Sequence, residues 1–459
     1  MVERSSLTDH IYAEFYAEWA TGLTLDDIPS SVRAVCRSMV LEVAGLCVAA
    51  SNEDYVAAVM ASLDGEGQCT VLGHARRLDA ANAALVNGTA AHGEDFDDSF
   101  EGTPVHAGAV MVPAVLGACE RFERSGADAL LGIVAGAELM CRMALVAPTG
   151  IHRAGFHPTA VLGALGAATG VGRALGHSSR QITDGIGIAG SLASGIIEYL
   201  AEGTWTKRLH AGWAAQSGVR AALLASHGFL GPRTVIEGEH GFFNAFSSPA
   251  VTPHYDEIID GLGERWCIED VAFKPYACGT MAHPFIDCAI RMADDGIRLD
   301  DIEKIHCRVG DGTVHRLWEP LAEKHRPTTP YSAKFSVPFC IAVAAHDRAA
   351  GLGQFTQARI SDPSVLELAC KVGYEIDPDN EYPSNYTGHL RVTLDDGDVR
   401  EFHQPHLRGG VREKLTDDEL LSKFYANAEH GGWSRSRAQR LENICRGIFE
   451  QTGIDFAQI

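Results

Sequence analysis

The sequence predicts a mainly α-helical protein of two domains, one all-helical and one smaller with both helices and strands. Apolar residues recur every three or four positions through roughly the first 265 residues, which is the helical period. Short β-branched runs appear only in the later part of the chain, and a helical pattern returns near its end. A chain of 459 residues is also too long for one compact core, which favours two domains.

The composition is that of an ordinary soluble globular protein, with 46% hydrophobic and 21% charged residues. Its 38 basic and 60 acidic residues give a net charge of −22, which argues against binding to nucleic acid or to an anionic membrane. The twelve cysteines are scattered without a Cys-x-x-Cys pair, and the first residues contain no apolar signal segment. We therefore expect a cytoplasmic protein with reduced thiols.

The helical part is rich in Ala, Gly and Leu, and its predicted helices end in Gly or Pro. The clearest helical patterns span residues 24–50, 127–147, 157–176 and 211–232. So many small residues on helices predict close helix–helix contacts. Two long uncharged stretches, 102–119 and 154–172, are interrupted by His and Pro, so we expect core helices there rather than membrane spans.

One glycine pattern needs a separate interpretation. Residues 185–190 read Gly-Ile-Gly-Ile-Ala-Gly, which matches the dinucleotide-binding fingerprint G-x-G-x-x-G. That fingerprint follows a strand and is itself followed, about 20 positions on, by an acidic residue. Here a helix-start pattern comes before it, and the sequence near residue 210 is not acidic, so we expect glycines that allow tight helix packing.

The predicted α+β part begins near residue 270. Residues 302–310 form a short β-branched run, and residues 390–405 alternate around Asp396-Gly397, which indicates a β-hairpin. Helical patterns accompany these strands at residues 283–296, 331–347 and 362–372. The tail from Thr416 onward is helical again, begins with the capping sequence Thr-Asp-Asp-Glu, and is expected to pack on the first domain.

A cluster of acidic residues lies between His92 and His106 and consists of Glu94, Asp95, Asp97 and Asp98. The residues alone leave three interpretations open. The acids can cap the helix predicted to begin near residue 105, where carboxylates are favourable. They can bind a metal, although their spacing matches neither an EF-hand nor a zinc pattern. They can also form a pocket wall in which one carboxylate orients a neighbouring histidine.

Other residues of chemical interest are scattered along the chain, and for each one a purely structural role is the alternative. His157 precedes a proline at a predicted helix start, where the helix dipole disfavours a protonated ring and suits a neutral base or an anion contact. Lys207 lies among aromatic residues in an acidic chain and suits carboxylate binding. The domain boundary, where ligand sites are common, and the second domain contribute Lys274, Cys278, His283 and Lys334.

Taken in order, these patterns resemble the MmgE/PrpD family over nearly the whole chain. The resemblance rests on "NGTAAHGEDFDDSF", "HAGAVMVPA", "GFHPTAVLGALGAA", "AGSLASGIIEYLAEGTWTKRLHAGWAAQSGV", "KPYACGTMAHPFIDCA" and "AKFSVPF". Members of the family include 2-methylcitrate dehydratases, cis-aconitate decarboxylases and iminodisuccinate epimerases. The motifs are specific for the family and poorly specific for the substrate.

The resemblance implies a large helical domain built from both chain ends, residues 1–269 and 405–459, with an inserted α+β lid domain at residues 270–404. It also implies a homodimer that acts on small di- or tricarboxylates without a metal or a cofactor. Matching the motifs residue by residue selects Asp95, Ser99, His106, His157 and Lys207, together with Lys274 and His283 of the second domain.

The family's reactions share one step, because all of them make or quench a carbanion next to a carboxylate. Such a step needs cations for the substrate and a base near a C–H bond. We expect His106 or His157 to move the proton and Asp95 to orient the imidazole. The residues expected to bind the substrate are Ser99, Lys207, Lys274 and His283.

Two departures from the family pattern bear on the reaction. Ser99 replaces the common threonine and keeps a hydroxyl group, whereas Gly279 stands where the decarboxylase has a histidine, five residues after Lys274. The second change counts against cis-aconitate decarboxylation. We therefore expect a hydro-lyase similar to 2-methylcitrate dehydratase. A decarboxylase, an epimerase of an iminodisuccinate-like dicarboxylate and an inactive carboxylate-binding relative are the alternatives.

Overall fold

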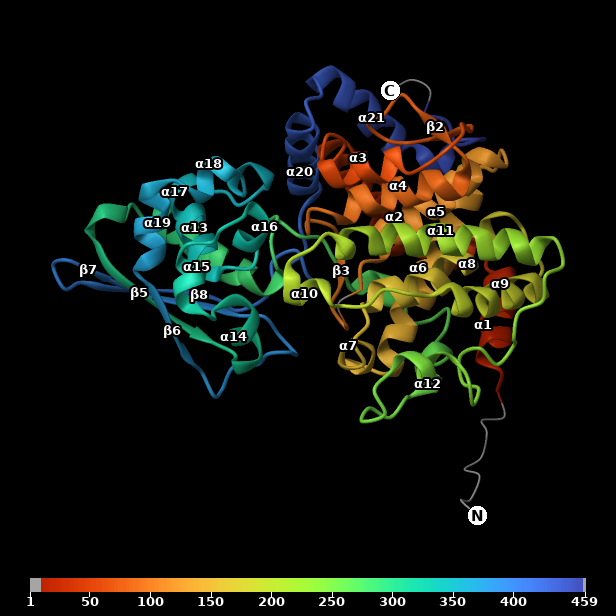
Figure 1. Cartoon of the computed structure of the whole chain (residues 1–459), viewed down its shortest axis with the longest axis horizontal. Coiled ribbons are helices and arrows are strands. Elements are labelled where there is room, and N and C mark those ends of the chain that lie inside the picture. Colours follow the sequence, from red (N-terminus) through yellow and green to blue (C-terminus); the bar gives the residue numbers. More distant parts are fainter. Residues whose placement is uncertain (1–9, 104, 457–459) are drawn as a thin grey trace, which may run out of the picture. The chain divides into compact units, whose positions relative to one another are not determined.

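A computed structural model of the chain describes residues 10–103 and 105–456. The protein is mainly helical, with 57% helix and 8% strand, as the sequence predicts (Figure 1). Contacts divide it into two compact units. The helical unit comprises residues 1–93, 97–271 and 427–459, and the mixed unit comprises residues 94–96 and 272–426. Residues 94–96 and 405–426 therefore group with the mixed unit, whereas the expected boundaries assign them to the helical domain. Residues 270 and 271, expected in the lid domain, group with the helical unit.

The helical unit contains long helices and a few short elements. The long helices are α1 (Tyr12–Gly22), α2 (Ser30–Ala49), α3 (Asp54–Ala61), α4 (Ala80–His92), α5 (Ala107–Arg121), α6 (Gly126–Val146), α8 (Pro158–Ala174), α9 (Ser179–Leu192), α11 (Thr206–Ser226) and α21 (Arg435–Arg446). The short elements are α7 (Gly150–Arg153), α10 (Tyr199–Glu202), α12 (Phe242–Phe246), the hairpin strands β1 (Cys69–Thr70) and β2 (Arg77–Leu78), and β3 (Ser99–Phe100).

Small residues let the central helices of this unit approach closely, as the sequence predicts. Helix α6 packs on α8, and α11 packs on both α4 and α8 (Figure 1). A Cβ added to Gly132 of α6 would lie 2.6 Å from the carbonyl oxygen of Gly170 on α8. A Cβ added to Gly88 of α4 would lie 2.7 Å from Cα of Gly212 on α11. Side chains at these positions would force the helices apart, so the glycines fix the spacing of the helices that bear the site.

The G-x-G-x-x-G segment lies within α9, as expected for a packing role. A Cβ on Gly187 would meet the backbone of Pro232 at 2.6 Å. The two uncharged stretches correspond largely to α5 and α8, both buried. Helix α6 is long and apolar enough to cross a membrane by composition, but 94% of its apolar window is buried inside the protein. It is a core helix by that measure.

The mixed unit combines a four-stranded sheet with short helices. The sheet order is β6-β5-β7-β8, with strands β5 (Ile302–Val309), β6 (Val372–Ile376), β7 (Gly388–Leu394) and β8 (Val399–Gln404). Strands β5 and β6 are parallel and the other pairs are antiparallel. The helices are α13 (His283–Asp294), α14 (Asp311–Leu317), α15 (Leu321–His325), α16 (Pro330–Ala333), α17 (Val337–Asp347), α18 (Gln357–Ile360) and α19 (Pro363–Cys370).

The predicted hairpin and tail are both present. Strands β7 and β8 pair around Gly397, whose φ of 86° is the left-handed conformation that this turn requires. Helix α20 (Asp417–His430) begins with the predicted capping box, in which the backbone N–H of Thr416 donates to Glu419 Oε2 at 2.7 Å. Helix α21, which follows, packs on α2 of the helical unit.

Candidate active site

The clustered acids of residues 94–98 are balanced by different partners. Asp98 caps α5: its carboxylate oxygens accept from the backbone N–H of Gly108 at 3.0 and 3.1 Å. A Cβ on Gly108 would lie 2.3 Å from Asp98 Oδ1, so glycine is needed for this approach. The helix-cap interpretation is therefore correct for Asp98. Asp97 and the two residues of the mixed unit, Glu94 and Asp95, have other partners.

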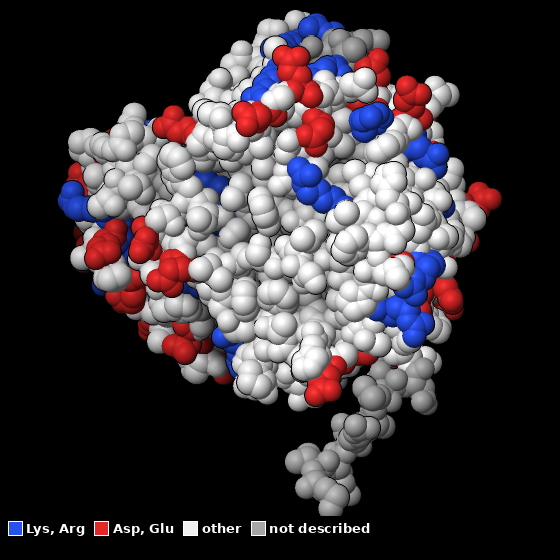
Figure 2. All heavy atoms as spheres, turned by 45° about the vertical axis from the view of Figure 1, so that its right-hand side comes forward, with Lys and Arg blue, Asp and Glu red and all other residues white. Residues whose placement is uncertain are grey.

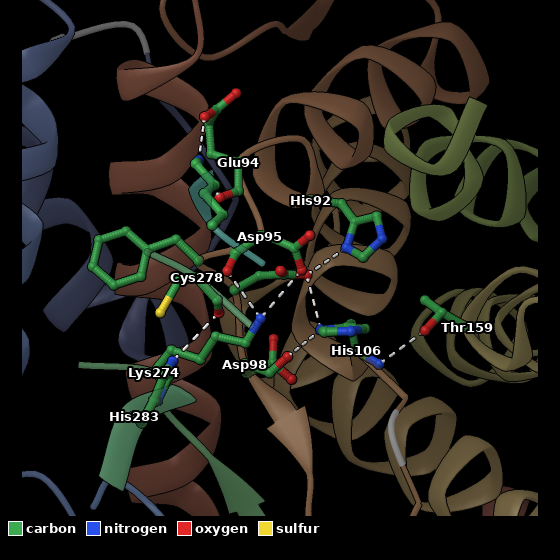
Figure 3. A network of polar contacts seen from close by, with 12 residues as sticks. His92, Glu94, Asp95, Asp98, His106, Thr159, Lys274, Cys278 and His283 are labelled. Atoms are coloured by element: carbon green, nitrogen blue, oxygen red, sulfur yellow. Dashed lines mark hydrogen bonds and ion pairs between the residues drawn. The ribbon is translucent and has the colours of Figure 1, made fainter. Parts of the chain in front are cut away.

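Asp97 is the carboxylate that the structure places on the imidazole of His106. Its Oδ2 lies 2.7 Å from Nδ1 of His92 and 3.3 Å from Nδ1 of His106. The two imidazole rings lie together, with centroids 4.8 Å apart (Figure 3). All three side chains are buried. The orienting role that the sequence assigns to Asp95 thus fits Asp97, two residues later.

Hydrogen bonding fixes which nitrogen of His106 carries the proton. Nδ1 of His106 lies 2.6 Å from the backbone oxygen of Asp98, in addition to its contact with Asp97 (Figure 3). Both neighbours are acceptors, so Nδ1 must be the N–H and Nε2 holds the lone pair of the neutral ring. Asp97 stabilises the imidazolium that forms when Nε2 takes up a proton, as a carboxylate does behind a catalytic histidine.

His157 begins a second pair of histidines in the helical unit. It is the N-cap of α8, and its backbone N–H donates to the carbonyl of Gly195 at 2.9 Å. Its Nδ1 lies 3.1 Å from Nδ1 of His210, which projects from α11. The ring of His157 stacks on His92 at 5.5 Å and lies 6.4 Å from that of His106. The four histidines therefore form one buried cluster.

The surroundings of this second pair disfavour positive charge. Burial lowers the pKa of His157 well below 6.5, and the neighbouring His92, His210 and Lys207 lower it further. Burial, with His92 and Lys207, lowers the pKa of His210 to about 4. Lys207 precedes His210 by one turn of α11. At neutral pH both rings are uncharged, beside a lysine that suits an anionic substrate.

The lowered pKa of His210 predicts a loss of stability on mild acidification. The unfolded chain, with a histidine pKa near 6.5, binds more protons than the folded chain between pH 6.5 and 4, so the free energy of unfolding falls as the pH falls through this range. For His210 the loss between pH 7 and 5 is about 2 kcal/mol. Urea unfolding at both pH values measures it. The His210→Asn variant should lose less stability than the wild type, and equal losses would contradict this account.

Within the mixed unit, three lysines contact the segment 94–96. Nζ of Lys334 donates to the backbone and carboxylate oxygens of Glu94 at 2.7 and 2.6 Å. Nζ of Lys274 lies 2.9 Å from the backbone oxygen of Asp95 and 3.4 Å from its Oδ1 (Figure 3). Nζ of Lys423 donates to the carbonyl of Phe96 at 2.7 Å. The ammonium of Lys274, expected to bind substrate, therefore has an internal partner.

His283 lies in the same unit as the first residue of α13 and is fully buried. Its Nε2 lies 3.3 Å from the carbonyl oxygen of Cys278 (Figure 3), and its Nδ1 has no hydrogen-bond partner among the described residues. Burial opposes ionisation of Cys278, but hydrogen bonding with Cys340 and the nearby His283 and Lys274 lower the pKa of this thiol to about 6.

The selected residues thus fall into two groups. Ser99, on β3, belongs to the helical unit with His106, His157 and Lys207, whereas the mixed unit holds Asp95, Lys274 and His283. Sequence reasoning did not assign roles to His92, Asp97 and His210. The adjacent acids gave no signal that distinguishes Asp97 from Asp95. His210 follows Lys207 by one helical turn, and that spacing is the signal that could have identified it.

One group among the described residues could meet around a metal ion. It consists of His92, Asp97 and His106, whose ligand atoms lie within 4.8 Å of one another. The hydrogen bonds oppose an ion beside the Nδ1 atoms, because Nδ1 of His92 keeps its proton for Asp97 and Nδ1 of His106 keeps its proton for the carbonyl of Asp98, so neither atom has a lone pair to offer.

We therefore expect turnover to survive removal of divalent metals. The protein is dialysed against EDTA, analysed for metals by mass spectrometry and then assayed. Unchanged activity in metal-free protein is the expected result, since the Nδ1 atoms of His92 and His106 are used in hydrogen bonds. A stoichiometric metal that is lost in Asp97→Asn, together with loss of activity on chelation, would refute it.

Comparison with known proteins finds matches along most of the chain. The profile of the MmgE/PrpD N-terminal domain matches residues 14–253, and that of the MmgE/PrpD C-terminal domain matches residues 276–446. The cis-aconitate decarboxylase of Aspergillus terreus is 28% identical, over 95% of this chain and 93% of its own length. The human cis-aconitate decarboxylase is 32% identical, over 77% of this chain and 73% of its own length. Decarboxylases of this kind are lyases.

Proposed function

Because the chain belongs to the MmgE/PrpD family and is an enzyme of the lyase class, we propose that it acts on a small di- or tricarboxylate by proton transfer next to a carboxylate. The proposed substrate class is a hydroxy-tricarboxylate like 2-methylcitrate, which loses water. The observation that carries this proposal is the buried histidine cluster, in which a carboxylate stands behind His106 while His157 is kept neutral.

The two histidines supply the acid and the base. Environments that push the proton affinities of neighbouring groups apart identify such a pair. The neutral ring of His157 accepts the proton. The charge of Lys207 disfavours the imidazolium form of His157, and a bound polyanion offsets that charge. His106 is the proposed acid, because Asp97 lies beside its Nδ1 and stabilises the imidazolium form, which donates a proton from Nε2. Lys207 binds a substrate carboxylate, and Ser99 binds a carboxylate or the hydroxyl group that departs.

These groups account for every proton and electron pair that moves in the dehydration. Nε2 of His157 takes the proton from the carbon next to a carboxylate, and the electron pair of that C–H bond becomes the new C=C bond. The C–O bond of the neighbouring carbon breaks, and the hydroxyl leaves as water with the Nε2 proton of His106, which starts this step as the imidazolium that Asp97 stabilises. His157 leaves the step protonated and His106 leaves it neutral, and proton exchange with solvent restores both rings. Charge that develops on the carboxylate in this step is stabilised by Lys207.

A substrate panel tests the proposal. Purified enzyme is incubated with 2-methylcitrate, cis-aconitate and iminodisuccinate, and the products are identified by mass spectrometry. Loss of water from 2-methylcitrate is the expected result. If wild-type enzyme leaves all three compounds unchanged, the proposed substrate class is wrong.

A second candidate is decarboxylation of a cis-aconitate-like tricarboxylate. It is favoured by the two relatives above, which are cis-aconitate decarboxylases and match this chain along most of their own length. In that reaction the C–C bond to a carboxylate breaks, carbon dioxide leaves and His106 protonates the carbanion. Gly279 argues against this candidate, because the decarboxylase has a histidine at that position. Release of carbon dioxide from cis-aconitate in the same panel, without loss of water from 2-methylcitrate, would favour this candidate.

We also propose that the protein is a homodimer. Apolar side chains that are 41–70% exposed gather between residues 196 and 230, namely Ile196, Leu200, Trp205, Trp213, Leu224, Phe229 and Leu230. Figure 2 shows a face on which a broad area carries no charged side chains, although the chain has a net charge of −22. Such a surface supports a second copy of the chain as partner.

Light scattering coupled to size exclusion should give about twice the chain mass of 49.2 kDa. A charge at Leu230 or Trp213, introduced as Leu230→Glu or Trp213→Glu, should shift the protein toward monomer because it places an unpaired carboxylate in the contact. Phe122→Glu, at another exposed apolar residue, is the control and should remain dimeric. A monomeric wild type would refute the proposal.

We also propose that the protein resides in the cytoplasm, which is supported by the absence of any disulfide among the twelve cysteines.

A further inference from the structure

The contact between His157 and His210 constrains both rings. Their Nδ1 atoms lie 3.1 Å apart, and both side chains are buried. Two nitrogens of the same kind at this distance share one proton, so one ring donates and the other accepts. Since both rings are neutral at pH 7, they must hold opposite tautomers. The donor keeps a lone pair on Nε2, and the acceptor carries its proton there.

We infer that His157 is the donor and that His210 is a positioning residue, whose Nδ1 accepts this hydrogen bond and holds His157 with its lone pair on Nε2. This inference rests on the proposed function, in which Nε2 of His157 is the base. The neutral imidazole in water prefers the proton on Nε2, so a partner is required to keep His157 in the other form. The bond made by one ring nitrogen sets the state of the other.

The other histidines of the cluster support this direction of the hydrogen bond. His92 and His106 also carry their protons on Nδ1, because Asp97 and the carbonyl of Asp98 face those atoms. The N-terminal end of α8 and Lys207 make the surroundings of His157 positive, which disfavours its imidazolium form, so Nε2 keeps a lone pair when Nδ1 donates. The ring of Tyr199 packs against both imidazoles, with centroids 6.4 Å from His157 and 5.7 Å from His210.

The tautomer is measured directly by long-range ¹H–¹⁵N spectra of histidine-labelled enzyme without substrate, with the His157 signals identified by their absence in His157→Gln. The wild type should show the proton of His157 on Nδ1. His210→Leu removes the acceptor and should move that proton to Nε2. His210→Asn offers an amide oxygen near the same position and should restore the wild-type pattern. His227→Leu, at an exposed histidine at the end of α11, is the matched control.

Kinetics give a second readout. A base contributes about 10²–10⁴-fold to rate, so a shift of most molecules to the wrong tautomer should lower kcat of His210→Leu about 10-fold or more. KM should change little, and His210→Asn should recover most of kcat. A wild-type His157 protonated on Nε2, or a tautomer unchanged in His210→Leu, would overturn the inference. The spectra need no substrate, so the tautomer of His157 is measured independently of the substrate panel. A failed panel would contradict the proposed function, whereas a wrong tautomer would contradict this inference.

Discussion

Replacing His106 by Asn should lower kcat by about 10²–10⁴-fold, which is the usual contribution of a positioned acid or base. In the proposed mechanism Nε2 of His106 transfers the proton, and Asp97 lies 3.3 Å from its Nδ1, where it stabilises the charged ring. Steady-state kinetics on the substrate that the panel identifies measure the change, and circular dichroism checks the fold.

His227→Asn is the matched control, because this histidine is exposed and lies outside the cluster. It should retain wild-type kcat. Asp97→Asn should approach the loss seen for His106→Asn, since an amide neither stabilises the imidazolium nor enforces the same tautomer. Full activity in His106→Asn, with normal folding, would remove this residue from the mechanism.

The largest expected effect on stability comes from Arg142→Met. Nε of Arg142 donates to Glu138 Oε1 at 2.7 Å, within α6, and both side chains are fully buried. The guanidinium also donates to the carbonyls of Asp260 and Arg265 at 2.8 and 2.7 Å. Glu138 accepts in turn from the backbone N–H of Cys267 at 3.0 Å. The pair therefore ties α6 to the chain segment around residues 257–268.

Removal of Arg142 leaves Glu138 charged and buried, which costs about 3–5 kcal/mol of unfolding free energy in such pairs. Urea unfolding at pH 7 measures it. Arg298→Met is the control, because Arg298 and Asp301 form an exposed pair at 3.6 Å whose loss should cost less than about 1 kcal/mol. Equal destabilisation by the two substitutions would show that the buried network is not the source of the effect.

Much of the fold could be predicted because local sequence patterns determine where its helices and its hairpin form. The helical period identified the core helices, and Asp396-Gly397 identified the β7–β8 hairpin, where Gly397 has the expected left-handed backbone. The domain boundaries depend on contacts distant in sequence. Residues 94–96 join the mixed unit through Lys274, Lys334 and Lys423, and no local pattern reveals those contacts.

The candidate site was predictable in composition but not in pairing. Motifs selected His106, His157 and Lys207, and all three lie in the helical unit. Which carboxylate faces the imidazole depends on the path of the backbone. Asp95 adopts a left-handed φ of 57°, and the chain then continues into Asp97, which contacts the histidines.

The roles of His92 and His210 come from tertiary packing alone. His92 ends α4 and His210 lies on α11, and these helices meet through glycines such as Gly88 and Gly212. A residue far away in sequence becomes a neighbour only when such helices are packed. The spacing of residues within one helix cannot predict contacts between residues on different helices.

The central claim is that His106 and His157 transfer a proton at the carbon next to a carboxylate of a small polycarboxylate. Proton NMR of 2-methylcitrate with the enzyme in D₂O tests it most directly. The wild type should convert the compound to the unsaturated tricarboxylate and, in the reverse direction, place deuterium at that carbon, whereas His106→Asn and His157→Gln should do so at least about 100-fold more slowly. Conversion by both variants at the wild-type rate, or no reaction and no exchange with the wild type, would contradict the claim.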